Sequence, residues 1–420
     1  MSGGARFHRV RMQTPAPRLD DVAAATDASL VASGVRLAAG TEVAIAAGSR
    51  GIADLPLVVE RVATWVRAQG ATPFLVPAMG SHGGATAEGQ REVLRSYGLD
   101  AAAIGCEIRA TMDVVELPQG DCPVPVVTDA AAARAAATIL VNRIKPHTDF
   151  HGPHESGLVK MAAIGLGKRV QAEALHAHGV RGLRDLMPLV GAQVLAHGNV
   201  VLGVGIVENA LDRTMHVEAI PVARLAVRER ELLDLARANA PRLPVERLDV
   251  LLVDRMGKDV SGVGMDTNVI GRVMIHGQDD PPAPRITMIG CHELTPASHG
   301  NATGVGLADV VSRRLADAID HEVTRTNIVT SGFLLRGKLP VVADDDRTVW
   351  EWCLRGAGVV DVAGVRAARI VDTLHCADLW VTDRVLADLR ADPGVRDHLD
   401  VLASGLELHD TAGALRPFDV

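Results

Sequence analysis

The segment from Lys145 to His178 holds the side chains most suited to chemistry. It contains five histidines, and glycines between them allow the backbone to approach a ligand closely. A histidine exchanges a proton near neutral pH and binds metal ions through a neutral ring nitrogen. A single histidine is more often a satisfied surface or core residue, but a group around one loop and the following helix indicates acid–base or metal chemistry. These histidines are His147, His151, His154, His176 and His178.

Lys160 is the candidate nucleophile of this segment. It follows the residues HESGLV and precedes the apolar run MAAIGLG, so we expect its amine to lie partly desolvated beside a polar loop. Burial lowers the pKa of a lysine and makes its amine able to attack a carbonyl or acyl group of a cofactor. An ion pair with Glu155 or Asp149 is the alternative, and the residues of the segment by themselves favour neither.

Strands that end in polar loops must position these side chains. Alternating apolar runs and helical patterns in the N-terminal half predict an α/β fold. In open parallel sheets, ligands gather beyond the carboxyl ends of the strands. We therefore expect the site where three strands end in polar, glycine-containing loops, at residues 48–51, 79–84 and 142–157.

The length of 420 residues, 48% of them hydrophobic, is sufficient for two domains with separate cores. A polar, proline-bearing stretch at 237–249 marks the boundary. We predict an N-terminal cofactor-binding domain over 1–240 and a C-terminal domain over 245–420 that closes the substrate cleft. Both are expected to be α/β domains with mainly parallel sheets, with the active site in the cleft between them. The C-terminal pattern also predicts a helix at 307–319.

Composition argues against several classes of function. The net charge of -8 and the absence of a long basic run argue against a nucleic-acid partner. The N-terminus lacks the apolar core of a secretory signal, and no stretch of about 18 apolar residues could span a bilayer, so we expect a cytoplasmic protein with no membrane partner. The five cysteines form no CxxC pair, which predicts buried, reduced side chains.

The order of a strand, a Pro-His loop, Ser-Gly-x-x-Lys, a glycine-containing apolar turn and a later histidine resembles the nickel-pincer lactate racemase family. The resemblance implies that Lys160 carries a covalently attached nickel-pincer nucleotide, nickel pyridinium-3,5-bisthiocarboxylic acid mononucleotide. It implies that His176, sixteen residues downstream, is a nickel ligand and that Ser156 belongs to the cofactor-binding motif.

The same resemblance implies two catalytic bases. His147 matches the histidine of the Pro-His loop, with His151 or His154 as substitutes because this loop is about three residues longer than in the family. The loops at 48–51 and 78–84 resemble those that bind the cofactor phosphate and the substrate. The residues implied there are Arg50, Ser81 and Gly83 for the cofactor and His82 as the second base.

Departures from the family concern the substrate. Gly83 follows His82 where the racemases usually have an arginine, and Leu158 replaces a second motif glycine. The second half of the chain resembles a divergent branch of the superfamily whose substrates are unassigned. The residues proposed to bind the substrate are Arg143, Lys145, Lys258, Asp266, Asn268 and His299. For the Asp and Asn residues, ordinary capping and turn formation are the alternative.

The implied reaction is racemisation or epimerisation of a 2-hydroxy acid, such as a sugar acid or a dicarboxylate. A histidine takes the hydroxyl proton while a hydride moves to the Lys-tethered nucleotide, and its return to the opposite face inverts the centre. The implied partners are this small-molecule substrate and the enzymes that make the cofactor. The alternatives are a metal-dependent hydrolase or lyase that uses the histidine cluster, and a non-catalytic protein that binds an anionic metabolite.

Overall fold

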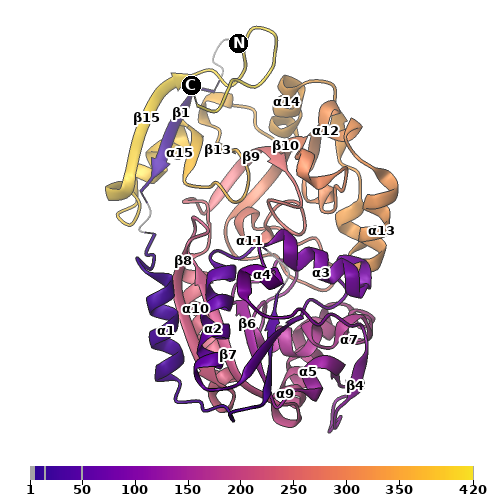
Figure 1. Ribbon diagram of the computed structural model, residues 1–420. Coiled ribbons are helices and arrows are strands. Elements are labelled where there is room, and N and C mark those ends of the chain that lie inside the picture. Colours follow the sequence, from indigo (N-terminus) through magenta and orange to yellow (C-terminus); the bar gives the residue numbers. More distant parts are fainter. Residues whose placement is uncertain (1–4, 14–15, 49–50, 420) are drawn as a thin grey trace. The chain divides into compact units, whose positions relative to one another are not determined.

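The apolar runs of the sequence form the strands of two separate sheets (Figure 1). The structure, a computed structural model, describes residues 5–13, 16–48 and 51–419. One compact unit, Ala16–Ala240, contains a five-stranded sheet. The other contains an eight-stranded sheet and joins strand β1 (Phe7–Met12) to the chain from Pro241 onward. The predicted fold class, two α/β domains with mainly parallel sheets, is confirmed.

Four parallel strands and an antiparallel edge strand form the sheet of the N-terminal unit. Their order is β3 (Thr72–Pro77), β2 (Glu42–Ala47), β6 (Ala137–Arg143), β7 (Val200–Glu208) and β8 (Thr214–Pro221). A separate antiparallel pair consists of β4 (Val114–Glu116) and β5 (Val127–Asp129). The helices of this unit are α1 (Val22–Ala32), α2 (Leu55–Ala68), α3 (Ala87–Ser96), α4 (Ala101–Ile104), α5 (Ala130–Arg134), α6 (Leu158–Lys160), α7 (Lys168–His176), α8 (Gly179–Arg181), α9 (Met187–His197) and α10 (Val222–Asn239).

Helices cover both faces of this sheet, which explains the uninterrupted apolar runs of its strands. Leu202 and Val204 of β7 pack in the same core as α1 and α2. Gly203 between them points the other way, and a Cβ there would meet Leu225 of α10 and Leu158 of α6. The sheet therefore forms the middle layer of three, and its carboxyl edge is left for loops.

Five parallel strands and three antiparallel strands form the sheet of the C-terminal unit. Their order is β12 (Val341–Ala343), β11 (Val310–Ser312), β10 (Arg285–Leu294), β9 (Arg247–Met256), β13 (Ala367–Ile370), β14 (Asp378–Thr382), β1 and β15 (Leu399–Leu406). The helices are α11 (Thr267–Ile270), α12 (Arg313–Asp317), α13 (His321–Ser331), α14 (Asp346–Gly356) and α15 (Asp383–Ala391). Among the described residues, no helix combines the length and apolar composition that a membrane span requires.

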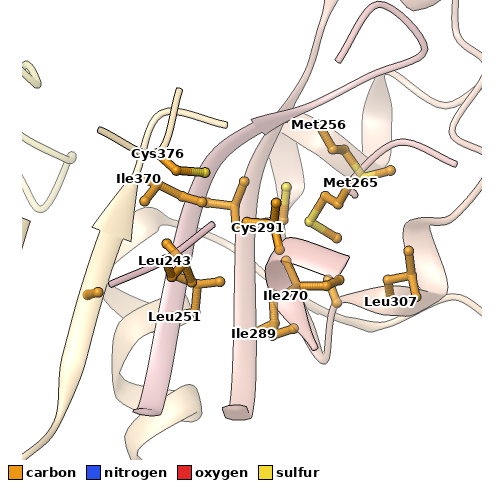
Figure 2. Close-up of a cluster of buried hydrophobic side chains, with 14 of the residues drawn as sticks. Leu243, Leu251, Met256, Met265, Ile270, Ile289, Cys291, Leu307, Ile370 and Cys376 are labelled. Carbon is orange, nitrogen blue, oxygen red and sulfur yellow. The ribbon is translucent and has the colours of Figure 1, made fainter. Parts of the chain in front are cut away.

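Aliphatic and sulfur-containing side chains fill the core of the C-terminal unit. Figure 2 shows Leu251, Ile289 and Ile370 packed with Cys291 and Cys376. All five cysteines of the chain are free and buried, which confirms the prediction. Burial raises the pKa of Cys291 to about 12, so its thiol is unreactive at neutral pH.

Two sequence-based assignments are corrected by the structure. Strand β1 was expected in the N-terminal domain, but it pairs with β14 and β15 and buries Phe7 and Val10 in the C-terminal unit. The helix expected at 307–319 instead contains buried strand β11 followed by the one-turn helix α12. Short apolar runs do not distinguish a buried strand from a helix, because the deciding strand pairings lie far away in sequence.

His409 makes the stability of the C-terminal unit depend on pH. Burial lowers its pKa from about 6.5 to about 4, and the charge of Arg347 contributes. Between these two pH values the His409 side chain is protonated in the unfolded chain but neutral in the folded chain. The contribution of His409 to the free energy of unfolding is therefore complete above about pH 6.5 and is lost as the pH falls to about 4. Between about pH 7 and pH 5 we expect a loss of about 2 kcal/mol in the free energy of unfolding from this residue.

Urea unfolding of the His409→Gln variant and the parent chain at these two pH values measures this effect. The variant should lose the part of the pH dependence that lies between these values. Asp346, which lies near His409, also has a lowered pKa. Its contribution to the pH dependence of stability therefore lies at more acidic pH, below 3.8, the ordinary pKa of an aspartate. An equal pH dependence in both proteins would show that His409 does not control it.

Candidate active site

A pocket of about 140 Å³ lies beyond the carboxyl ends of β2, β3 and β6. Four of its lining side chains are histidine, lysine or arginine, and no described lining residue is an aspartate or a glutamate. The pocket therefore suits an anionic ligand. Its polar lining residues are His82, Asn142, Arg143, Lys145, Ser156 and Lys160.

Lys160, the last residue of α6, lines this pocket, and its Nζ lies 2.6 Å from Nε2 of His147. The backbone N–H of Asp149 donates to Nδ1 of the same ring at 3.0 Å, so a neutral His147 carries its proton on Nε2. Lys160 thus places a primary amine, a group that reacts as a nucleophile once it is uncharged, directly against this ring. The carboxylate of Glu155 accepts hydrogen bonds from the His147 backbone and from Arg237.

His151 and His154, the proposed substitutes for His147, do not line the pocket. His151 is about half exposed, and its Nδ1 lies 3.3 Å from Glu155. His154 is buried, with its Nδ1 2.8 Å from a carboxylate oxygen of Glu229. These contacts hold the loop in place, and His147 is the histidine that reaches Lys160.

His82 lies in the loop between β3 and α3, where it is exposed and lines the pocket. Gly83 has a φ of 64°, a conformation that glycine adopts without strain. A Cβ there would lie 2.5 Å from a backbone carbon of Gly89, so the packing of the loop on α3 requires glycine. Ser81 is exposed and is not among the lining residues. Arg50, predicted to bind phosphate, lies outside the described residues.

Arg143 and Lys145 place two cations at the end of β6. The Arg143 guanidinium forms an ion pair with the buried carboxylate of Glu208, which also accepts the backbone N–H of Ala53 at 2.6 Å. Lys145 and Ser156 exchange backbone hydrogen bonds of 2.9 and 3.2 Å, which close the base of the Pro-His loop. The strand end therefore fixes these three residues in the pocket wall.

His176 is the last residue of α7 and does not itself line the pocket. The residue is exposed, yet desolvation by the surrounding protein lowers the pKa of its ring, and the charge of Lys160 lowers it further while Asp149 opposes this. The ring is therefore neutral near pH 7, which is the form that binds a metal ion.

Comparison with known proteins identifies the fold. No family model and no curated protein sequence matches the chain. The solved structure of the lactate racemase apoprotein from Thermoanaerobacterium thermosaccharolyticum is similar, with a TM-score of 0.50 and 10% sequence identity, over 87% of this chain and 94% of that one. The chain has a lactate racemase-like fold. At this identity the similarity concerns the arrangement of the chain and not its activity.

Glu229 of α10 is a residue of this site region that the sequence analysis missed. Its buried carboxylate accepts hydrogen bonds from the first backbone N–H groups of α6, those of Leu158 and Val159, and contacts His154. A Cβ at Gly157 would lie 2.6 Å from the same carboxylate, so the glycine of the Ser-Gly-x-x-Lys motif permits this contact. A single acid on the apolar face of α10 was the available signal, because a buried carboxylate needs partners.

Replacing Glu229 with alanine should leave His154 and two backbone N–H groups buried without this partner. We expect the free energy of unfolding to fall by about 3 kcal/mol, as when one member of a buried pair is removed. Urea unfolding measures this. Glu231→Ala on the same helix is the matched control, since Glu231 is exposed and pairs with Arg228 on the surface, and its effect should stay within about 0.5 kcal/mol. Equal losses in the two variants would contradict the structural role of Glu229.

Three of the four substrate candidates of the C-terminal unit, Lys258, Asp266 and Asn268, have local side-chain partners. The Lys258 ammonium donates to the Gly262 carbonyl at 2.8 Å and to Asn327 at 2.6 Å. Asp266 precedes α11 and accepts the backbone N–H and side-chain amide of Asn268, at 2.9 and 3.1 Å, which is the capping chemistry considered as the alternative. His299 is exposed, with a φ of 48° at the end of a 3₁₀ turn.

Proposed function

We propose that the protein is an isomerase that racemises or epimerises a 2-hydroxy acid with a nickel-pincer nucleotide attached to Lys160. The observation that carries this proposal is the 2.6 Å contact between the Lys160 amine and His147 in a cation-lined pocket. The fold shared with a lactate racemase apoprotein supports it.

The residues present fit nickel pyridinium-3,5-bisthiocarboxylic acid mononucleotide. Lys160 offers an amine for covalent attachment, and Ser156, another residue of the pocket wall, offers a hydroxyl to the cofactor. His176 offers a neutral imidazole for nickel. Among the described residues no three His, Cys, Asp or Glu side chains converge on one point, so these residues suit a cofactor that brings its own metal donors. When bound, this cofactor supplies the hydride acceptor.

The side chains of the pocket then bind the substrate and move its proton. Cations at Arg143 and Lys145 hold the carboxylate and fix the substrate beside the reacting group. His147 and His82 are imidazoles from different loops. One of them can take the hydroxyl proton of one enantiomer, and the other can take that of the opposite enantiomer; in the reverse direction each returns a proton to the product. Asn142 offers a further polar group to substrate hydroxyls.

The substrate is expected to be more polar than lactate. The polar lining of the pocket and the absence of the family's arginine at Gly83 motivate this expectation. We expect a polyhydroxy or dicarboxylic 2-hydroxy acid to be converted at least about tenfold faster than lactate, a difference of about 1.4 kcal/mol in transition-state binding. Chiral chromatography of parallel reactions measures both rates, and equal rates would make this refinement wrong.

The decisive experiment is expression of the chain with and without the enzymes that make the cofactor. Co-expressed protein should show a covalent mass adduct, bound nickel and inversion of a 2-hydroxy acid, and protein expressed alone should show none of these. No adduct after co-expression would overturn the proposal. An unmodified Lys160 with metal-dependent cleavage would indicate a hydrolase or lyase, and tight ligand binding without turnover would indicate a binding protein.

A further inference from the structure

Lys168 is a fully buried lysine beside the loop that carries His82. Its ammonium donates to the carbonyl of Pro77 and to Oε1 of Gln90 at 3.1 Å, and it lies 3.0 Å from Asp129. Burial lowers its pKa, and the charge of Asp129 opposes that shift. The chain contains only five lysines against thirty-eight arginines. A compact ammonium in this interior position therefore has a specific task, since burying a charge is costly unless it is fully paired.

Gln90 of α3 extends these contacts to the loop. Its fully buried side-chain amide donates to the carbonyl of Gly80 at 2.8 Å and to the carbonyl of His82 at 3.4 Å. Lys168 and Gln90 together thus bind three carbonyls between the end of β3 and His82. Hydrogen bonds from buried donors restrain the backbone at these three carbonyls.

The backbone at Lys168 has a conformation that is unusual for a residue with a side chain. Its φ of 55° lies in the left-handed region, where glycine is free of strain and a side chain is not. A residue other than glycine is therefore retained at a conformational cost. The same stretch contacts the loop directly, because the Gly80 N–H donates to the Gly165 carbonyl at 3.2 Å and a Cβ at Gly165 would lie 2.7 Å from the Ala78 carbonyl.

We infer that Lys168 and Gln90 are positioning residues that fix His82 at the pocket. This inference rests on the proposed function for the role of His82 as a base. Lys160 and Lys168 belong to one stretch of chain, so that stretch supplies the cofactor attachment site and also anchors the loop of the second base. Neither Lys168 nor Gln90 lines the pocket.

Hydrogen exchange of the full-length holoprotein tests the inference, with Lys168→Met and Gln90→Met as variants. We expect amides of residues 78–85 to exchange at least about tenfold faster in both variants, with the amides of β6 and β7 unchanged. We also expect kcat to fall at least about tenfold with a KM within about twofold, and the limb of the pH profile that belongs to His82 to move. The mass adduct at Lys160 should remain in both variants.

Arg169→Met is the matched control, because Arg169 is the next residue on α7 but is exposed and pairs with Glu173 on the surface. It should leave exchange, kcat and the pH profile at parent values. Unchanged exchange at 78–85 in the folded variants would overturn the inference, and so would a loss of kcat with an unchanged pH profile. If Lys168→Met does not fold, Gln90→Met decides alone. Hydrogen exchange of the loop is measured independently of catalytic turnover. An inactive parent holoprotein would therefore contradict the proposed function without deciding whether Lys168 and Gln90 fix the loop.

Discussion

Replacing Lys160 with alanine is expected to abolish the covalent mass adduct and to lower turnover by more than about 10³-fold. The physical reason is that Lys160 supplies the amine of the proposed attachment, and groups that act as one catalytic unit lose nearly all activity together. Intact mass spectrometry of protein co-expressed with the cofactor-making enzymes measures attachment. Chiral analysis of the product measures turnover in the same preparation.

Two further variants separate attachment from charge. Lys160→Arg keeps a cation beside His147 but has no primary amine, so it should lack the adduct as completely as the alanine variant. Lys145→Ala removes another ammonium of the same pocket and should keep the adduct while binding substrate less tightly. An adduct of unchanged mass on Lys160→Arg would show that the cofactor is attached elsewhere and would leave Lys160 an ion-pairing role.

The location of the pocket could be predicted because it depends on local sequence. Each of the three strands is an apolar run followed at once by polar residues, and parallel pairing places these ends at one sheet edge. Lys160 and His147 are thirteen residues apart, so a single loop brings them together. Spacing along the chain was therefore sufficient to connect them.

Contacts between distant segments could not be predicted in this way. Glu229 meets Leu158 across 71 residues, and only the packing of α10 on α6 reveals that His154 serves this carboxylate and not the pocket. Strand β1 pairs with strands more than 360 residues away. Apolar periodicity reports that a side chain is buried, but it does not report which distant element buries it.

Replacing His176 with alanine is expected to remove nickel from the protein while the organic adduct stays on Lys160. A neutral imidazole is a good nickel ligand, and the lowered pKa of His176 keeps it neutral near pH 7. In the proposed attachment, the Lys160 amine and not this ring is joined to the cofactor. Metal analysis should therefore show more than about a tenfold loss of nickel per adduct, with the adduct itself still present by mass.

His178→Ala is the matched control, because His178 is the histidine two residues further along the chain and is not the implied nickel ligand. It should retain nickel at the parent ratio. Equal nickel loss in the two variants would point to a general disturbance of the end of α7, and full retention in His176→Ala would remove His176 from the metal site. Because nickel and adduct are measured on one sample, loss of the metal is distinguished from failure to load the cofactor, which would lower both together.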